Sequence, residues 1–494
     1  MSTYKASIFN YIFNSVNTVI MIVNGIIMVP LYFHYMSVST YGAWLASGNV
    51  ISMLGLIESG FASVITQKMS VTIANKDNSG FLKLAGANLI TALLFSSIIL
   101  IIGLSISPFV SDWVNVEESN SSDIRIAFII ALVASCISII VSLNGAFPQV
   151  WQNTKSVGIL NTISNIIAIL SLVVFLFIGC GVVSIALSYL VRALLNLFLQ
   201  GQWILRYWKK KGLQRPLFDG NTIKDLFKAC VYPFLSKLSG VFMGHSQSFI
   251  IAYFMNPALA AVYDITTKVS GVAVTFVSQT NGSFFALFSL TMASKDQNRI
   301  NDVFKKTSTF FFVSLLSVAL FSMCFSEPII KYWVGLDKFG GTILLSMVMA
   351  ASIVGQTRRY CNNIIYTGGL INKSAKLDIL CMVVYLLILF IIIKYVQVYA
   401  IPLAGGLSGL IFMVWYLRIM QKDLHIDIRM MLKIALSSIV TIIPFLAIHF
   451  MLGFDYNKLF SYIIYVLVFT VAYGFVVYLT NKDFTKLLLS KFHH

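Results

Sequence analysis

The stretch LAGANLITALLFSSIILIIGLSIS, residues 84–107, carries no charged side chain along its whole length. A helix of about 20 such residues crosses the roughly 30 Å hydrocarbon core of a bilayer, so this stretch predicts a transmembrane helix. The rest of the chain is similar, because 58% of its 494 residues are hydrophobic and only 11% are charged. A soluble domain of this size needs more charge to wet its surface. The chain is therefore predicted to be an all-α polytopic membrane protein.

Apolar runs of this length recur along the chain without a large polar domain between them, and they predict fourteen transmembrane helices. The first run is too long for the core of a signal peptide and lacks a small-residue cleavage site, so it is interpreted as the first span. The expected spans are residues 8–33, 42–66, 84–107, 124–146, 157–177, 181–203, 229–252, 262–290, 307–326, 341–364, 377–394, 398–418, 431–451 and 458–480.

The lysines and arginines, 35 in total, are concentrated in alternate connections between the spans. Because positively charged connections stay in the cytoplasm, this asymmetry predicts that both termini are cytoplasmic. A long basic connection, residues 206–220, falls on the cytoplasmic side, whereas the first long connection on the other side is acidic. The formal net charge of +17 is thus explained mostly by the cytoplasmic connections of a membrane protein. Basic residues scattered over separate short connections argue against nucleic-acid binding.

The six cysteines form no CxxC pair and no Cys/His spacing typical of a metal site. They are interpreted as small apolar fillers, and the sequence predicts neither a metal centre nor a cofactor. The chain also lacks the phosphate-binding GxxxxGKS or GxxxxGKT loop, so ATP hydrolysis by this chain is not expected.

Three short patterns each recur once at nearly the same separation, which indicates an internal repeat of six spans. The patterns pair Lys155 with Lys373, the Leu-Ser pair at 187–188 with that at 407–408, and Tyr41 with Tyr263. Because six is even, both repeats cross the membrane in the same direction. This arrangement is found in transporters whose substrate site lies between two parallel halves.

The repeat predicts an N-lobe over residues 1–210, with spans one to six, and a C-lobe over residues 222–425, with spans seven to twelve. Residues 211–221 are expected to form a cytoplasmic linker, and the basic side chains around it would attract anionic headgroups. Residues 426–494 are expected to hold a further helix pair and a cytoplasmic tail. The expected architecture is thus two parallel six-helix lobes with a C-terminal pair.

The stretch VPLYFHYMSVSTYGAWLASGNVISMLGLIESGFASVITQK, residues 29–68, resembles the first two helices of the O-antigen flippases. These Wzx-like proteins form part of the polysaccharide transporter family in the multidrug/oligosaccharidyl-lipid/polysaccharide (MOP) exporter superfamily. The family pattern has a proline, then Tyr-Gly before an aromatic residue, then an acidic residue and a glycine, and a basic residue ahead of a polar loop. Here these positions are Pro30, Tyr41, Gly42, Trp44, Glu58, Gly60 and Lys68. The chain departs from the pattern at residues 36–37, where Met-Ser replaces Leu-Gly, and it has Glu58 and Lys68 where Asp and Arg are commoner.

The resemblance implies a flippase, not an enzyme, that carries a polyprenyl-diphosphate-linked oligosaccharide across the bacterial cytoplasmic (inner) membrane by alternating access. The oligosaccharide would be an O-antigen unit for lipopolysaccharide or another surface polysaccharide unit. The implied partners are membrane lipids, a polymerase and other polysaccharide assembly proteins.

Three alternatives stay open on the sequence. A lipid II flippase of the same superfamily would obey the same physics. A multidrug exporter would use acids in its cavity to attract cations. A membrane glycosyltransferase or polymerase would need catalytic groups in a sizeable outer loop, whereas the expected outer connections are short.

Five cations remain inside the spans once the connections are assigned: Arg192, Lys237, Lys268, Arg358 and Arg359. An ionisable group within a span costs at least about 2.5 to 3.5 kcal/mol, so it normally faces a cavity or a partner. These side chains predict a net positive cavity that binds a diphosphate. The alternatives are that Lys237 snorkels to the surface and that the two adjacent arginines are interfacial anchors, at most one of which lines the cavity.

Four asparagines of the first span share one helical face at four-, three- and seven-residue steps: Asn10, Asn14, Asn17 and Asn24. Amides on a cavity-lining face suit the donors and acceptors of sugar hydroxyls, so they are candidate substrate ligands. Polar contacts between helices are the alternative explanation for one or two of them.

Few acids fall inside the spans, and they are the candidates for coupling transport to H⁺ or Na⁺. Glu58 and Asp264 are the acidic candidates, although Lys268 lies one turn after Asp264 and would neutralise it. Glu58 could instead be a structural partner of a cation near the cytosolic surface. His245 is a further candidate because histidine changes charge near physiological pH, with a helix-contact role as its alternative.

Overall fold

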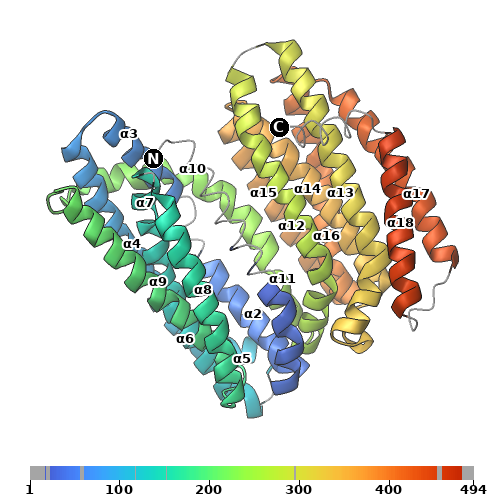
Figure 1. Ribbon diagram of the computed structural model, residues 1–494, viewed down its shortest axis with the longest axis horizontal. Helices are drawn as coiled ribbons and strands as arrows, with labels where there is room; N and C mark the ends of the chain where they lie inside the picture. The colour runs from blue at the N-terminus through green and yellow to red at the C-terminus, as the bar shows by residue number, and fades with distance from the viewer. Residues whose placement is uncertain are drawn as a thin grey trace. The chain divides into compact units, whose positions relative to one another are not determined.

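The structure is a computed structural model that describes residues 17, 20, 23–55, 61–116, 118–151, 153–293, 296–452 and 459–480. The described residues form helices joined by short turns and contain no strand (Figure 1). The prediction of an all-α polytopic membrane protein is confirmed.

Eight helical stretches in the described part of the chain are long and apolar enough to cross a membrane. One of them, Ile371–Lys422, contains two helices that match two consecutive expected spans, α15 (Ile371–Val396) and α16 (Ala400–Lys422). Half of the expected first span lies outside the described residues. The total of fourteen spans therefore stays a prediction.

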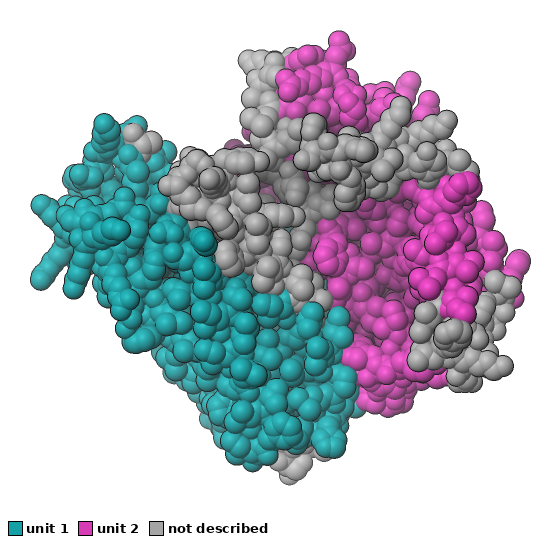
Figure 2. Space-filling model, viewed as in Figure 1, with its two compact units in different colours: residues 1–261 teal, residues 262–494 magenta. Residues whose placement is uncertain are grey.

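The chain divides into two compact units, residues 1–261 and residues 262–494 (Figure 2). Unit 1 begins with a helix over residues 23–35, and the expected linker at 211–221 lies within this unit. The other helices of unit 1 are α2 (Val38–Leu54), α3 (Phe61–Ala74), α4 (Asn78–Ile106), η2 (Ser107–Phe109), α5 (Val110–Trp113), α6 (Glu118–Asn144), α7 (Ala146–Val150), α8 (Thr154–Phe177), α9 (Val183–Lys210), α10 (Gly220–His245) and α11 (Gln247–Phe254).

Unit 2 contains most of α12, whose first residues belong to unit 1. Its helices are α12 (Pro257–Ala293), α13 (Gln297–Trp333), η3 (Leu336–Lys338), α14 (Thr342–Thr367), α15, η4 (Gln397–Tyr399), α16, α17 (Ile428–Leu452) and α18 (Leu459–Thr480). The chain therefore passes from one unit to the other inside a helix, and not in the connection between α9 and α10.

Several helices begin at acidic or hydroxyl side chains that cap their first turn. Ser37 accepts a hydrogen bond from the backbone N–H of Thr40 at 3.1 Å and starts α2. Asp77 and Asp296 cap α4 and α13 in the same way. Such side chains satisfy backbone donors that the helix leaves free, which typically contributes about 1 kcal/mol. These caps fix where each helix starts after a polar turn.

The same pattern of helix packing occurs in both units. In unit 1, α4 packs on α6, α6 packs on α9, and α8 packs on α9 (Figure 1). In unit 2, α13 packs on α14, α14 packs on α16, and α15 packs on α16. The third to sixth expected spans and the ninth to twelfth thus make the same pairs. An internal duplication of six helices would produce this recurrence.

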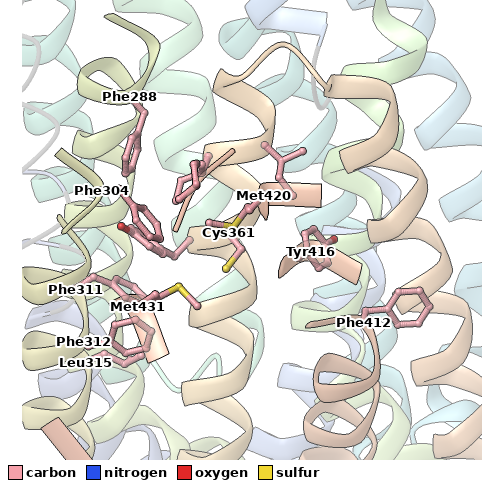
Figure 3. Close-up of a cluster of buried hydrophobic side chains, with 14 of the residues drawn as sticks. Phe288, Phe304, Phe311, Phe312, Leu315, Cys361, Phe412, Tyr416, Met420 and Met431 are labelled. Atoms are coloured by element: carbon pink, nitrogen blue, oxygen red, sulfur yellow. The ribbon is translucent and has the colours of Figure 1, made fainter. Parts of the chain in front are cut away.

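The core of unit 2 is a cluster of buried aromatic and aliphatic side chains from α12, α13, α14 and α16 (Figure 3). Tyr360 is fully buried there, and its ring stacks on Phe311 with centroids 4.5 Å apart. Its hydroxyl is within 2.9 Å of the hydroxyls of Thr307 and Ser308, so the one polar atom of the ring is satisfied. This cluster holds α14 firmly within the unit.

The connection between α9 and α10 is bound to unit 1. The indole N–H of Trp208 donates to the backbone carbonyls of Leu213 at 3.1 Å and Gln214 at 3.0 Å. Farther along, the N–H of Leu217 donates to the carbonyl of Leu82 at 3.0 Å. A Cβ on Gly86 would lie 2.0 Å from the carbonyl oxygen of Leu217, so the approach of the connection to α4 requires glycine.

Aromatic rings of α4, of α7 and of the residue that caps α7 surround Trp208 of α9. Phe81 stacks on it with ring centroids 5.9 Å apart, and Phe147 and Trp151 meet it edge-on at 5.7 and 6.1 Å. At the other end of the α10–α11 pair, the amide of Asn115 donates to the carbonyls of residues 252 and 253. Both ends of this pair are therefore held within unit 1.

Candidate functional site

Arg192 lies on α9 between two cavities of unit 1 and lines both of them. The cavities measure about 50 and 230 Å³, and the ring of Tyr189 is part of both walls. The guanidinium carbon of Arg192 is 5.6 Å from the centroid of that ring, a cation–π distance. Within the described residues, no carboxylate lies at ion-pair distance from Arg192. The positive charge is thus presented to the cavities.

The smaller cavity brings together two side chains predicted from the sequence, Arg192 and Asn24. Its other polar wall residues are Tyr32, Asn165 and Ser188. The side-chain oxygen of Asn24 is buried and has no hydrogen-bond partner among the described residues. A buried polar atom without a partner is uncommon and calls for a ligand or a water molecule. The wall of this cavity therefore offers both a cation and an unused acceptor.

The larger cavity has an aromatic corner and a wall of small side chains. The rings of Trp44 and Tyr189 meet with centroids 5.9 Å apart at 51°. Apart from Ile51 and Arg192, the rest of the lining consists of small or short residues of α2 and α6 and the α2 C-cap, including Gly48, Ser52 and Ser135. Small residues leave room beside the aromatic corner, and their hydroxyls add donors and acceptors. The sequence analysis named Trp44 as a position of the family pattern, but it did not predict that this ring lies beside Tyr189.

A row of polar side chains continues from Arg192 along α9 at four-residue steps: Ser188, Arg192, Asn196 and Gln200. The amide of Gln200 donates to the side-chain oxygens of Asn161 at 2.6 Å and Asn196 at 3.3 Å. This row faces α8, because Asn161 belongs to that helix. The steps of four residues were visible in the sequence and could have predicted the row.

The two described first-span asparagines, Asn17 and Asn24, lie near residues of the same helix, α8. The side-chain oxygen of Asn17 accepts hydrogen bonds from Asn165 at 2.9 Å and from Thr162 at 3.3 Å. Asn24 lines the smaller cavity together with Asn165. The structure thus places these two asparagines on one polar face with α8. The predicted ligands Asn10 and Asn14 lie outside the described residues.

Arg358 of unit 2 is only 6% exposed and forms an ion pair with Asp378 of α15. The same carboxylate accepts from the hydroxyl of Tyr416 at 2.7 Å and from the amide of Asn362 at 2.9 Å. Arg358 donates in addition to Tyr416 at 3.3 Å. Its charge is therefore neutralised inside unit 2, and the sequence missed this partner because it lies on another helix.

The remaining predicted cations lie in different environments. The side chain of the adjacent Arg359 is exposed. Lys268 forms an ion pair with Asp264 at 3.0 Å, and the two side chains are 23% and 26% exposed. The expected neutralisation of Asp264 by this lysine is present. Lys237 lies in α10, and its side chain is outside the described part of the structure.

Of the two other ion-coupling candidates, His245 lines neither of the cavities around Arg192. His245 is the last residue of α10, and its side chain is exposed. Glu58 lies outside the described residues.

Solved structures of two kinds of membrane transporter share this fold. A lipid II flippase MurJ, in an inward closed conformation, matches with a TM-score of 0.70 at 14% identity, over 96% of this chain and 99% of that chain. An inward-facing multidrug resistance MATE family transporter of the MOP superfamily matches with a TM-score of 0.66 at 13% identity, over 81% of this chain and 94% of that one. A Vibrio cholerae MATE transporter matches with a TM-score of 0.61 at 12% identity, over 85% and 98% of the two chains.

These likenesses define the fold as that of the helical MOP-superfamily transporters. At the level of sequence, the family model described as "Polysaccharide biosynthesis protein" matches residues 34–337, more than half of the chain. The chain belongs to this polysaccharide biosynthesis family. The resemblance to Wzx-like polysaccharide transporters is confirmed. No curated protein matches the sequence.

Proposed function

We propose that the protein is a flippase that carries a polyprenyl-diphosphate-linked oligosaccharide from the inner to the outer leaflet of the bacterial cytoplasmic membrane. The observation that carries this proposal is Arg192, which has no ion-pair partner in the part of the chain that the structure describes and lies on a wall rich in amides. Membership of the polysaccharide biosynthesis family and the flippase fold of MurJ support it. The oligosaccharide would be an O-antigen or another surface polysaccharide unit, and both termini would be cytoplasmic.

The diphosphate accounts for the cation. A charge in the membrane interior costs at least about 2.5 to 3.5 kcal/mol unless it faces water or a partner. Arg192 meets the requirement by lining two cavities, and its planar guanidinium suits paired phosphate oxygens. When the diphosphate enters, two charges of opposite sign would offset each other, while the polyprenyl tail stays in lipid.

The sugars account for the neutral polar wall. Asn24 and Asn165 border the cavity with Arg192, and the row of amides continues to Gln200. Amides both donate and accept, as sugar hydroxyls do. The corner formed by Trp44 and Tyr189 offers an aromatic surface for the apolar face of a sugar ring. A carrier for a simple lipid phosphate would not need this wall.

The rival functions are less well supported. A multidrug exporter would use carboxylates to attract cations, whereas among the described residues no Asp or Glu lines either cavity around Arg192. A lipid II flippase would also present a diphosphate and sugars, so lipid II is the second candidate substrate. If transport is coupled to H⁺ or Na⁺, Glu58 stays the candidate on the sequence, because Asp264 is paired with Lys268.

The proposal is tested in vesicles that contain the purified protein and a fluorescent polyprenyl-diphosphate oligosaccharide. Arg192→Ala should lower the flipping rate at least about tenfold, because one charge-assisted contact is worth about 1.5 to 3 kcal/mol. Arg192→Lys should keep part of the rate. Lipid II, offered in parallel, reports whether that substrate is preferred.

The matched control is Arg418→Ala. Arg418 also lies 5.6 Å from an aromatic ring, that of Trp415, but it lines none of the cavities around Arg192. It should leave the rate within about twofold, since it is an exposed surface side chain. Equal flipping by wild type and Arg192→Ala would contradict the proposal. If only lipid II were flipped, the protein would still be a flippase, but its substrate would be lipid II.

A further inference from the structure

A third cavity of unit 1 lies apart from Arg192, between α3, α4 and the start of α10. Its volume is about 490 Å³, within the range of roughly 300 to 1,000 Å³ typical of small-molecule sites. It lies at the end of the unit that carries the α3–α4 turn and the α9–α10 connection, the end predicted to be cytoplasmic. The lining residues are Gln67, Lys68, Val71, Thr72, Gly80, Lys83, Leu84, Thr222 and Asp225.

Two lysines give the cavity its charge. Lys68 comes from α3 and is half-buried, and Lys83 comes from the first turns of α4. In the described part of the chain neither has a carboxylate within ion-pair distance. Asp225 is the acidic side chain of the lining, so the two ammonium groups exceed the carboxylate by one charge.

The neighbouring acids are already used by the backbone. Asp219 caps α10 by accepting from the N–H of Thr222 at 3.2 Å and from its hydroxyl at 2.5 Å. These hydrogen bonds lower the pKa of Asp219 below its ordinary value, and the charge of Lys83 adds a smaller effect in the same direction. Asp77 caps α4 through the N–H of Gly80 at 2.8 Å. Both helix starts at the cavity are therefore already capped, and the lysines are its available cationic groups.

We propose that this cavity binds a phosphate group through Lys68 and Lys83, with Gln67 and Thr72 as neutral donors. Two ammonium groups from neighbouring helices, within reach of an amide and a hydroxyl, match the several oxygens of one phosphate or diphosphate. The group could come from the headgroup of an anionic lipid in the adjacent leaflet or from a prenyl diphosphate. The experiment separates these two sources.

The inference does not rest on the proposed function. The site uses none of the residues around Arg192, and a transporter of another substrate would still bind phosphate here. The two proposals are distinguished if Arg192→Ala loses flipping but keeps phosphate binding. They are also distinguished if substitution of Lys68 and Lys83 loses phosphate binding but keeps flipping.

The test uses the full-length protein in phosphatidylcholine nanodiscs. Binding is measured for three soluble probes, which are inorganic pyrophosphate, farnesyl diphosphate and dihexanoyl phosphatidylglycerol. The double variant Lys68→Gln/Lys83→Gln should weaken binding about tenfold, because each partly exposed charge contact contributes a few-fold. Asp225→Asn should strengthen binding about threefold by removing a like charge, a gain that structural damage would not produce.

The matched control is Lys209→Gln/Lys210→Gln. These exposed lysines end α9 in the same unit and change the net charge equally, but they do not line the cavity. Binding of the phosphatidylglycerol probe without pyrophosphate identifies a lipid headgroup, and competition between pyrophosphate and farnesyl diphosphate identifies a diphosphate. The proposal is overturned if no probe binds, if the control loses as much affinity as the cavity variant, or if Asp225→Asn weakens binding.

Discussion

Helices α9 and α16 hold equivalent places in the two units, but their equivalent faces differ in chemistry. Each packs on two neighbours in the same pattern, and the Leu-Ser pairs at 187–188 and 407–408 align them. On α9 the face reads Ser188, Arg192, Asn196 and Gln200, and on α16 the same positions are Ser408, Phe412, Tyr416 and Met420.

The two faces have different surroundings. Arg192 borders two cavities, whereas Phe412 is 7% exposed and Met420 is fully buried in the core of unit 2. A duplicated fold can therefore keep a polar face toward a cavity in one half and close the same face into a packed core in the other. We infer that unit 1 supplies most of the ligand chemistry, and that this part of unit 2 supplies rigidity.

The buried face of α16, formed by Ser408, Phe412, Tyr416 and Met420, is called the closed face. The largest expected effect comes from removing the carboxylate that Tyr416 of this face binds. Asp378→Asn would leave the charge of Arg358 buried without a counter-ion, which should cost about 3 to 5 kcal/mol of stability. Thermal unfolding in detergent and accumulation in the membrane measure this loss. Asp423→Asn is the control, because its ion pair with Lys373 is half-exposed and should matter by less than about 1 kcal/mol.

A second variant separates charge from packing at the same place. Arg358→Met combined with Asp378→Leu removes both charges and should recover most of the stability, since apolar residues of similar volume often replace a buried ion pair without loss. A single Asp378→Asn variant as stable as wild type would show that the carboxylate is not needed by Arg358.

Tyr416→Phe should have a smaller effect of about 2 kcal/mol. Tyr416 is fully buried, and its hydroxyl donates to Asp378 at 2.7 Å and accepts from Arg358. Removing it takes one hydrogen bond from each charged group and leaves the ring in place. Equilibrium unfolding measures the change, and the corresponding α9 variant Asn196→Leu should cost less than about 1 kcal/mol because the amide of Gln200 keeps Asn161. Equal losses of unfolding free energy in Tyr416→Phe and Asn196→Leu would contradict the difference between the faces of α16 and α9.

Copying the closed face onto α9 should affect transport more than stability. Arg192→Phe gives α9 the residue that α16 has at the equivalent position, Phe412. We expect the flipping rate to fall at least about tenfold, because the cation is lost and the cavity is partly filled, while stability changes by no more than about 1 kcal/mol. Flipping rate and thermal midpoint are measured on the same preparation. If Arg192→Phe lowered the thermal midpoint strongly but kept the flipping rate of the wild type, Arg192 would be a structural residue and not a substrate ligand.

Asp264→Asn should have the smallest effect, below about 0.5 kcal/mol. Asp264 and Lys268 are one turn apart on α12, and both side chains are about a quarter exposed. Ion pairs of this kind contribute little to stability. Thermal unfolding tests the effect on stability, and vesicle flipping with and without H⁺ or Na⁺ gradients tests whether Asp264 carries a coupling ion. A gradient dependence that disappears in Asp264→Asn would make Asp264 the coupling acid despite its lysine.

Most of the helical fold could be predicted because apolar length alone selects a membrane helix. Periodicity predicted that the first-span asparagines share a face, and of the two described ones Asn17 bonds to Asn165 of α8 and Asn24 lines a cavity with the same residue. Partners on other helices could not be predicted this way. Arg358 and Arg192 look alike in the sequence, and only packing shows that Asp378 lies beside the first and two cavities lie beside the second.

The neutral wall around Arg192 was missed for a related reason. Asn161, Asn165 and Gln200 are isolated polar residues in apolar runs, and each has a local explanation as a contact between helices. The spacing of four residues from Ser188 to Gln200 was the available signal. The cavity between α3, α4 and α10 was not predicted, because Lys68 and Lys83 fall just outside the expected spans 42–66 and 84–107, in a connection whose positive charge the charge asymmetry already explained.

Cutting the backbone between residues 214 and 217 would not separate unit 1 into two bodies. On one side of the cut, Trp208 binds the carbonyls of Leu213 and Gln214, and on the other side Leu217 binds Leu82. The helix that follows packs against α2, α3 and α4 of the same unit. Two polypeptides that meet at this point, made separately in one cell, should therefore assemble and purify together, so the covalent link is dispensable here while the packing is not.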